Sequence, residues 1–151
     1  KEYNYCLIYS YGVHEEIYSF KDKILDLENI ILSIKNRYDD KIKIIIKKHP
    51  QEKDNIVKIL EKKYKDFVFV SELNSIILSI NCSFAIGIGT TGGLFTPHFL
   101  KKTALNYYRN YDNYYNYLSS KKIKFCIVEN NIQTAKNLTS LKKFINHATN
   151  L

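Results

Sequence analysis

The chain has 151 residues, 45% of them hydrophobic, which is enough for one domain with a sizeable core. Its formal net charge of +8 favours phosphorylated ligands, polyanions or anionic lipid surfaces as partners. Most lysines stand singly among apolar residues, as on a solvated surface, so we expect no nucleic-acid partner. The sequence contains neither a signal peptide pattern nor an apolar run of the roughly 20 residues that a transmembrane helix needs.

The cysteines bear on the cellular compartment, and the first residue bears on whether the chain is part of a longer protein. Cys6, Cys82 and Cys126 each lie in an apolar run without metal-ligand spacing, so we expect buried thiols in a cytoplasmic protein, and no metal. The chain begins with Lys1 and contains no methionine, and we therefore expect it to be part of a longer protein.

Short apolar runs alternate with helical patterns along the chain. Residues 5–9 (YCLIY) predict a buried strand, and apolar residues recur every three or four positions from 14 to 37, as on one face of a helix. The stretch 108–117 is rich in tyrosine and shows no clear pattern. In chain order we expect strand 5–9, helix 14–37, strand 42–46, helix 51–64, strand 67–70, helix 73–80, strand 83–88, helix 89–100, strand 103–107, strand 123–128 and helix 132–145.

Continuously apolar strands separated by helices indicate a parallel sheet covered on both faces, because parallel strands need crossover connections. We therefore predict an α/β fold with a doubly wound, Rossmann-like parallel sheet of about six strands, and one domain over residues 1–151. Sheets of this kind bind ligands at the carboxyl ends of their strands. The residues that follow each strand are thus the candidate site residues.

The most informative of these segments is the turn at 87–93 (GIGTTGG), between an expected strand and helix. Glycines let a ligand approach the backbone, and a helix N-terminus offers unpaired N–H groups and positive potential to a phosphate. The segment matches neither a P-loop nor a complete dinucleotide fingerprint. Alternatively, the glycines only form a tight turn, which a threonine caps. The candidate phosphate-binding residues are Gly89, Thr90, Thr91 and Gly92.

Lys48, His49 and Pro50 end the second expected strand. A histidine held by a following proline can donate to a phosphate oxygen, or pass a proton to a leaving phosphate, and a lysine adds positive charge. His49 is therefore the candidate catalytic residue. The alternative is an exposed turn after an edge strand, where lysine and proline are common.

Two further segments complete the candidate donor site. Glu72 follows the third expected strand, where a carboxylate accepts hydrogen bonds from a ribose or merely begins a helix. Ser10 and Gly12 follow the first strand and are placed to close over the donor, unless they form an ordinary turn.

Lys-His-Pro after one strand, Glu after the next and a hydroxyl pair in a glycine-containing turn together resemble a known family. It is the carboxyl-terminal, donor-binding domain of bacterial sialyltransferases and polysialyltransferases with the glycosyltransferase B fold. The resemblance implies metal-independent transfer of a CMP-linked sugar to a cell-surface glycan, as in capsule or lipooligosaccharide synthesis. It implies that His49 contacts the donor phosphate, Glu72 the ribose, and Thr90 with Thr91 the phosphate.

The resemblance also implies a missing amino-terminal domain, which carries the general base in an acidic motif before glycine. Asp39-Asp40 is followed by lysine, so this chain lacks that motif and is expected to bind a donor without transferring it. We expect a location in the cytoplasm, peripheral to the inner face of the bacterial membrane.

Three alternatives stay open. The family usually has a serine pair where this chain has Thr90-Thr91, so the donor is alternatively another nucleotide sugar, or a CDP-alcohol as in related teichoic-acid polymerases. A UDP-sugar 2-epimerase-like domain would share the phosphate turn. A non-catalytic basic module would bind nucleic acid or an anionic membrane, with steep salt dependence and no need of Glu72.

Overall fold

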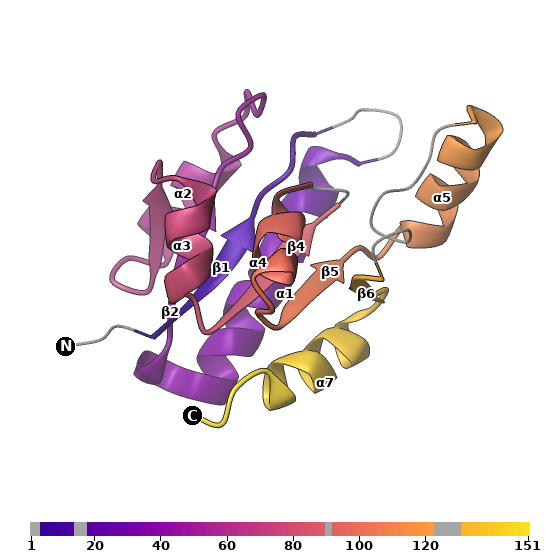
Figure 1. The fold of residues 1–151 in the computed structure, drawn as a ribbon. Coiled ribbons are helices and arrows are strands. Elements are labelled where there is room, and N and C mark those ends of the chain that lie inside the picture. Colours follow the sequence, from indigo (N-terminus) through magenta and orange to yellow (C-terminus); the bar gives the residue numbers. More distant parts are fainter. Residues whose placement is uncertain (1–3, 14–17, 90–91, 123–130) are drawn as a thin grey trace.

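The computed structural model describes residues 4–13, 18–89, 92–122 and 131–151. These residues form a six-stranded parallel sheet with helices on both faces, so the predicted doubly wound α/β fold is confirmed (Figure 1). The strands are β1 (Tyr5–Tyr9), β2 (Lys43–Lys47), β3 (Val68–Ser71), β4 (Phe84–Ile88), β5 (Ala104–Tyr107) and β6 (Gln133–Ala135). Their order across the sheet is β3-β2-β1-β4-β5-β6. The helices are α1 (Phe20–Tyr38), α2 (Ile56–Lys63), α3 (Ser75–Asn81), α4 (Phe95–Phe99), α5 (Tyr111–Ser120) and α7 (Leu138–His147).

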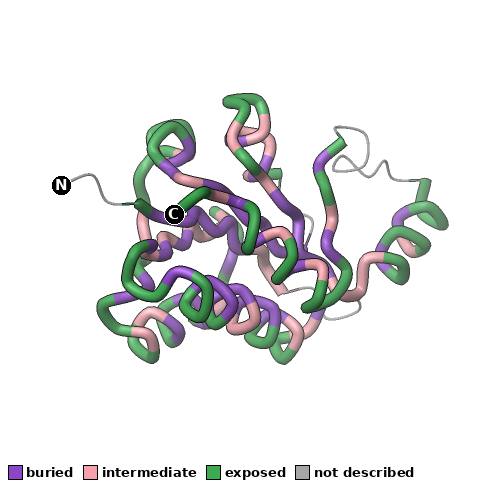
Figure 2. The backbone as a smooth tube through the Cα atoms, turned by 90° about the horizontal axis from the view of Figure 1, so that it is seen from below, coloured by how far each residue is buried: buried purple, intermediate pink, exposed green. Residues whose placement is uncertain are grey.

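Side chains along β1, β2 and β4 alternate between two cores, as the pleat of a strand requires. In β1, Cys6 and Ile8 join the larger core, which also contains side chains of α1, α2 and α7. Leu7 and Tyr9 join the smaller core, which contains side chains of α3 and of the turn before α4. Figure 2 shows the resulting pattern, with buried backbone in the strands and on the inner sides of helices.

Local sequence explains where α1 begins. The Ser19 hydroxyl accepts from the backbone N–H of Asp22, and the Asp22 carboxylate accepts from the backbone N–H of Ser19, which is a capping box. The helix therefore starts at Phe20, later than the predicted start at 14, and residues 14–17 lie outside the described part of the chain. The inward face of the helix carries Leu27, Ile30 and Ile34, all fully buried.

The end of the chain differs from the prediction. Residues 133–135, expected to be helical, form the edge strand β6, which pairs with β5. The helix begins only at Leu138, because the Asn137 side chain caps it by accepting from the backbone N–H of Ser140. The strand predicted at 123–128 lies outside the described residues.

Two other segments also differ from expectation. The unpatterned stretch at 108–117 includes most of α5, whose Tyr114 and Leu118 lie one helical turn apart and reach the larger core. The helix predicted from 89 to 100 is two short pieces, a 3-10 turn at Gly92–Leu94 and then α4. Figure 1 shows α5 projecting to the right, past β5 and the edge strand β6.

Cys6 and Cys82 are buried, as expected, whereas Cys126 lies outside the described residues. Burial raises the pKa of the Cys82 thiol to about 11. Among the described helices, none is both long and apolar enough to cross a membrane.

Candidate functional site

The order of the strands indicates where a ligand site would lie. From β1 the chain proceeds to β2 and β3 on one side, and then returns to place β4 on the other side of β1. Doubly wound sheets bind ligands at such a reversal point, beyond the carboxyl ends of the strands. A hollow of about 240 Å³ lies there, and we call it the switch-point pocket. Its described lining is Tyr9, Ser10, Lys47, Lys48, His49, Pro50, Ser75, Gly92 and Gly93.

The structure brings five of the residues predicted from sequence together in this pocket: Ser10, Lys48, His49, Pro50 and Gly92. They come from the ends of β1 and β2 and from the turn after β4, which are distant in sequence but adjacent across the sheet.

Two more hollows are related to the switch-point pocket by lining residues that they share. A small one shares His49 with it and is also lined by Gly12, another predicted site residue. A larger hollow of about 530 Å³ shares Gly12, Val13 and Gln51 with the small one, and extends to Phe20 at the start of α1. His49 thus lines the switch-point pocket and the small hollow, and the small hollow shares three lining residues with the larger one.

The side chain of Glu72 is not part of the described lining of these hollows. Glu72 is exposed, and its described contact is through the backbone carbonyl, which accepts from Lys47 Nζ at 3.2 Å. Its predicted hydrogen bond to a ribose therefore stays a prediction.

Close packing explains two glycines of the turn after β4, because a side chain at either position would meet a tyrosine ring. Gly89 has φ +62°, and a Cβ there would lie 2.9 Å from Tyr11 Cδ1. A Cβ on Gly93 would lie 2.2 Å from Tyr9 Cδ1, whereas one on Gly92 would meet open space. The turn therefore packs directly on tyrosines that follow or end β1. The predicted contacts of Thr90 and Thr91 fall on residues outside the described part of the chain.

The hydrogen bonds of His49 determine which ring nitrogen donates. Its Nδ1 accepts from the backbone N–H of Gln51 at 3.1 Å. In the neutral ring the hydrogen must then be on Nε2, which makes that atom a hydrogen-bond donor. The ring also packs edge to face with Tyr11, at 6.2 Å between centroids. A donor nitrogen suits a phosphate oxygen.

Two lysines line the pocket with their charges uncompensated by carboxylates. Lys48 Nζ donates to the backbone carbonyl of Asp54 at 3.0 Å, and Lys47 Nζ donates to that of Glu72. Neither amine forms an ion pair within the described ranges. Two ammonium groups without an ion-pair partner in the described ranges therefore lie at the pocket, which suits an anion.

Sequence reasoning missed the ionic support beneath the pocket. The carboxylate of Glu52 accepts from the Ser10 hydroxyl at 3.0 Å and from the backbone N–H of His49 at 3.1 Å. Glu52 also pairs with Lys23, a fully buried residue of α1 whose ammonium group lies 2.8 Å from the carboxylate of Asp54. Glu52 follows His49 by three residues, the spacing at which a glutamate returns to a backbone N–H, and this was the available signal.

Tyr9 is also part of the lining that sequence reasoning missed. It is buried except for 3% of its surface, and burial raises the pKa of its hydroxyl. The neutral phenol contacts Ser79 Oγ at 2.9 Å, which ties the end of β1 to α3. Its ring thus forms a rigid wall against Gly93.

Groups of three or more His, Cys, Asp or Glu that could hold a metal ion do not occur among the described residues. No protein-family model matches the sequence, and no curated protein matches it either.

Proposed function

We propose that the switch-point pocket binds the phosphate of a nucleotide-activated sugar and that the chain is the donor-binding domain of a glycosyltransferase. The observation that carries this proposal is the convergence of His49, two lysines and a glycine turn in one hollow where the strand order reverses. Each of these groups supplies a hydrogen-bond donor, positive charge or close backbone approach, as a phosphate requires.

In the proposed reaction, the bond between the sugar's anomeric carbon and a phosphate oxygen breaks, and the phosphate keeps the electron pair. Negative charge grows on that phosphate as the bond breaks. Donors that are already in place stabilise such charge without reorganising. We assign that role to His49 Nε2–H, to Lys48 and, from the sequence alone, to the hydroxyls of Thr90 and Thr91.

The larger hollow offers a place for the sugar of the proposed ligand. Its volume of about 530 Å³ is within the range of small-molecule sites and leaves room for a sugar next to the phosphate. We take the donor to be CMP-linked, with a sialic acid-like sugar, on the resemblance of the motifs.

A missing amino-terminal domain and a glycan acceptor complete the proposed enzyme. The two carboxylates beneath the pocket, Glu52 and Asp54, are already bound by Lys23 and by backbone N–H groups, so neither suits the role of general base. We therefore propose that this chain binds the donor and that the missing domain deprotonates the acceptor. The proposed location is the cytoplasm, at the inner face of a bacterial membrane, where the positive charge suits anionic lipids.

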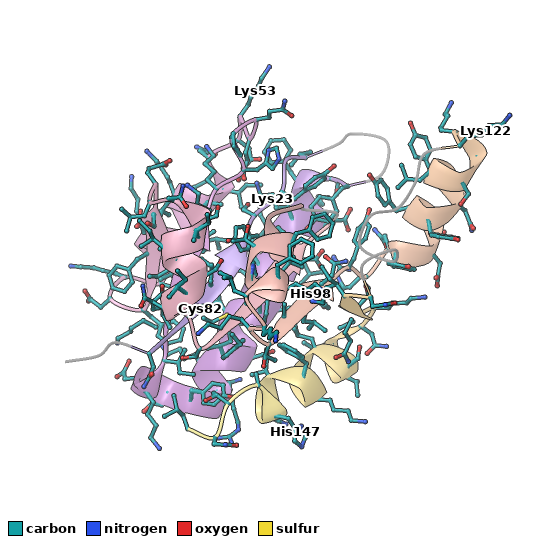
Figure 3. All side chains as sticks on the ribbon, in the orientation of Figure 1. Lys23, Lys53, Cys82, His98, Lys122 and His147 are labelled. Atoms are coloured by element: carbon teal, nitrogen blue, oxygen red, sulfur yellow. The ribbon has the colours of Figure 1, made fainter. Side chains whose placement is uncertain are left out.

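Calorimetric titration of the chain with CMP, UDP and CDP tests the proposal. We expect saturable binding of CMP that His49→Ala weakens by about tenfold or more, because a hydrogen bond to a charged group is lost. His147→Ala is the control, since this exposed histidine lies at the end of the molecule away from the loop that carries Lys53 (Figure 3).

The other outcomes are equally informative. A preference for UDP or CDP would overturn the CMP assignment. Failure of all three to bind, or equal binding by His49→Ala and wild type, would contradict the proposed phosphate site. Salt-sensitive binding to anionic vesicles or nucleic acid without nucleotide binding would favour a basic binding module instead.

A further inference from the structure

A buried ionic cluster lies beneath the switch-point pocket, and the proposed chemistry makes no direct use of it. Lys23 is fully buried and pairs with the carboxylates of Glu52 and Asp54. Figure 3 shows Lys23 inside the molecule, whereas Lys53 projects from the outer tip of the loop after β2. Removing these charges from water costs several kcal/mol per ion, and an apolar filling of the same space is often at least as stable. The cluster therefore calls for a role beyond filling the interior.

The contacts of Glu52 indicate such a role. One carboxylate oxygen, Oε1, accepts from Ser10 Oγ, and the other, Oε2, accepts from the backbone N–H of His49. Ser10 directly follows β1 and His49 lies two residues beyond β2, and both line the switch-point pocket. A single buried side chain is thus hydrogen-bonded to two walls of the pocket.

The same residue closes the turn that carries His49. The backbone N–H of Glu52 donates to the backbone carbonyl of His49 at 3.0 Å, while its side chain accepts from the N–H of His49. Within this turn lies Gln51, whose N–H donates to His49 Nδ1. The turn that Glu52 closes therefore also holds the Gln51 N–H against His49 Nδ1, and this contact leaves the imidazole hydrogen on Nε2.

We propose that Glu52, anchored by Lys23, is a positioning residue that sets the backbone of His49 and thereby the ring tautomer that faces a phosphate. This role rests on the proposed function, because the phosphate is what the positioned ring would bind. A carboxylate suits the position, since each of its two oxygens accepts hydrogen bonds. A glutamine has one such oxygen, and its amide group would point either at the His49 N–H or at the Ser10 hydroxyl and Lys23 ammonium.

Glu52→Gln in the whole chain tests the proposal with two measurements. The first is the pair of imidazole nitrogen shifts of His49 in ¹⁵N NMR, assigned by comparison with His49→Ala. We expect the wild type to show hydrogen on Nε2 and the variant to show a mixture of tautomers. The second is calorimetry with CMP, where we expect the dissociation constant to rise by about tenfold.

Glu61→Gln is the matched control, because the Glu61 carboxylate also accepts a backbone N–H, that of Val70 at 2.7 Å, but lines none of the hollows around His49. We expect this variant to leave both measurements unchanged. If Glu52→Gln does not fold, Ser10→Ala removes one partner of Glu52, and we expect shifts in the same direction and a smaller loss of about threefold.

The two proposals fail in different ways. Unchanged His49 tautomer in folded Glu52→Gln, or an equal effect of Glu61→Gln, would overturn the positioning role whether or not a nucleotide binds. If wild-type protein binds no nucleotide, the proposed function fails, while the tautomer in the free protein still reports on Glu52.

Discussion

Two ionic clusters involve the first turns of α1, and only one of them reaches the switch-point pocket. The first joins Lys23 to Glu52 and Asp54 in the loop after β2, and its lysine has 0% exposure. The second joins Arg109, after β5, to Asp22 and Asp26.

The second cluster is more open, and its residues lie outside the described lining of the switch-point pocket. Arg109 keeps 26% of its side chain exposed, and its guanidinium pairs with the buried carboxylate of Asp26. The hydroxyl of Tyr18 also donates to Asp26, at 3.0 Å. None of these residues belongs to the described lining of the pocket. This cluster fixes the segment after β5 against α1, whereas the first cluster fixes the loop that carries His49.

Charged residues on one helix thus serve two purposes, which depend on whether their partners lie in the loop after β2 or in the segment after β5. We expect damage to the first cluster to change both stability and nucleotide binding. We expect damage to the second cluster to change stability alone. Three substitutions test this separation, in order of decreasing effect.

Lys23→Met should have the largest effect. It leaves Glu52 and Asp54 buried without their cation, so we expect the free energy of unfolding to fall by about 3 to 5 kcal/mol. Urea denaturation at neutral pH measures this loss. Lys21→Met, at an exposed position on the same helix, should change it by less than about 0.5 kcal/mol. Equal results for the two variants would show that the buried cluster adds nothing to stability.

Arg109→Met should cost less, about 1 to 3 kcal/mol, because Asp26 keeps the hydrogen bond from Tyr18. The same denaturation experiment measures it, and Arg37→Met, which loses the contact of an exposed arginine with the Tyr38 ring, should cost under about 1 kcal/mol. CMP affinity should stay at the wild-type level in Arg109→Met. A tenfold loss of affinity would break the distinction between the two clusters.

Asp26→Asn should have the smallest effect, which is a change in how the free energy of unfolding depends on pH. Burial raises the pKa of Asp26 above its ordinary value of 3.8, although Arg109 and Tyr18 oppose the shift. Between the ordinary and raised values the folded protein binds more protons than the unfolded chain, so this group lowers the free energy of unfolding as pH rises. The asparagine variant should lose that contribution.

Urea denaturation at a series of pH values upward from about 4 measures the slope for each protein. Asp112→Asn, at an exposed position whose carboxylate pairs with Lys136 on the surface, serves as the control. If Asp26→Asn has the wild-type slope, the buried carboxylate of the second cluster does not titrate in this window.

The sequence allowed the fold class to be predicted because the central strands are short apolar runs, such as those at 5–9 and 84–88. It did not allow α5 to be recognised, because tyrosines occupy both its inner and outer positions and obscure the helical period. The strand β6 was missed because its three residues carry no apolar run and, among the described strands, pair with β5 alone.

The site was partly predictable for a related reason. Lys48, His49 and Pro50 follow a strand directly, so their place at the sheet edge follows from the topology. Lys23 gave no comparable signal, since it is one lysine among many and its partner Glu52 lies 29 residues away. Only the packing of α1 against the loop after β2 brings these two together.

The contact between Gly93 and the Tyr9 ring also constrains how this protein can vary. With Tyr9 in place, any side chain at position 93 would collide with its ring. A larger residue at 93 would therefore need a smaller one at 9, and the pocket wall would change shape with both. In relatives of this chain, the two positions should change together, and a library that randomises only one of them should recover mostly the original residue.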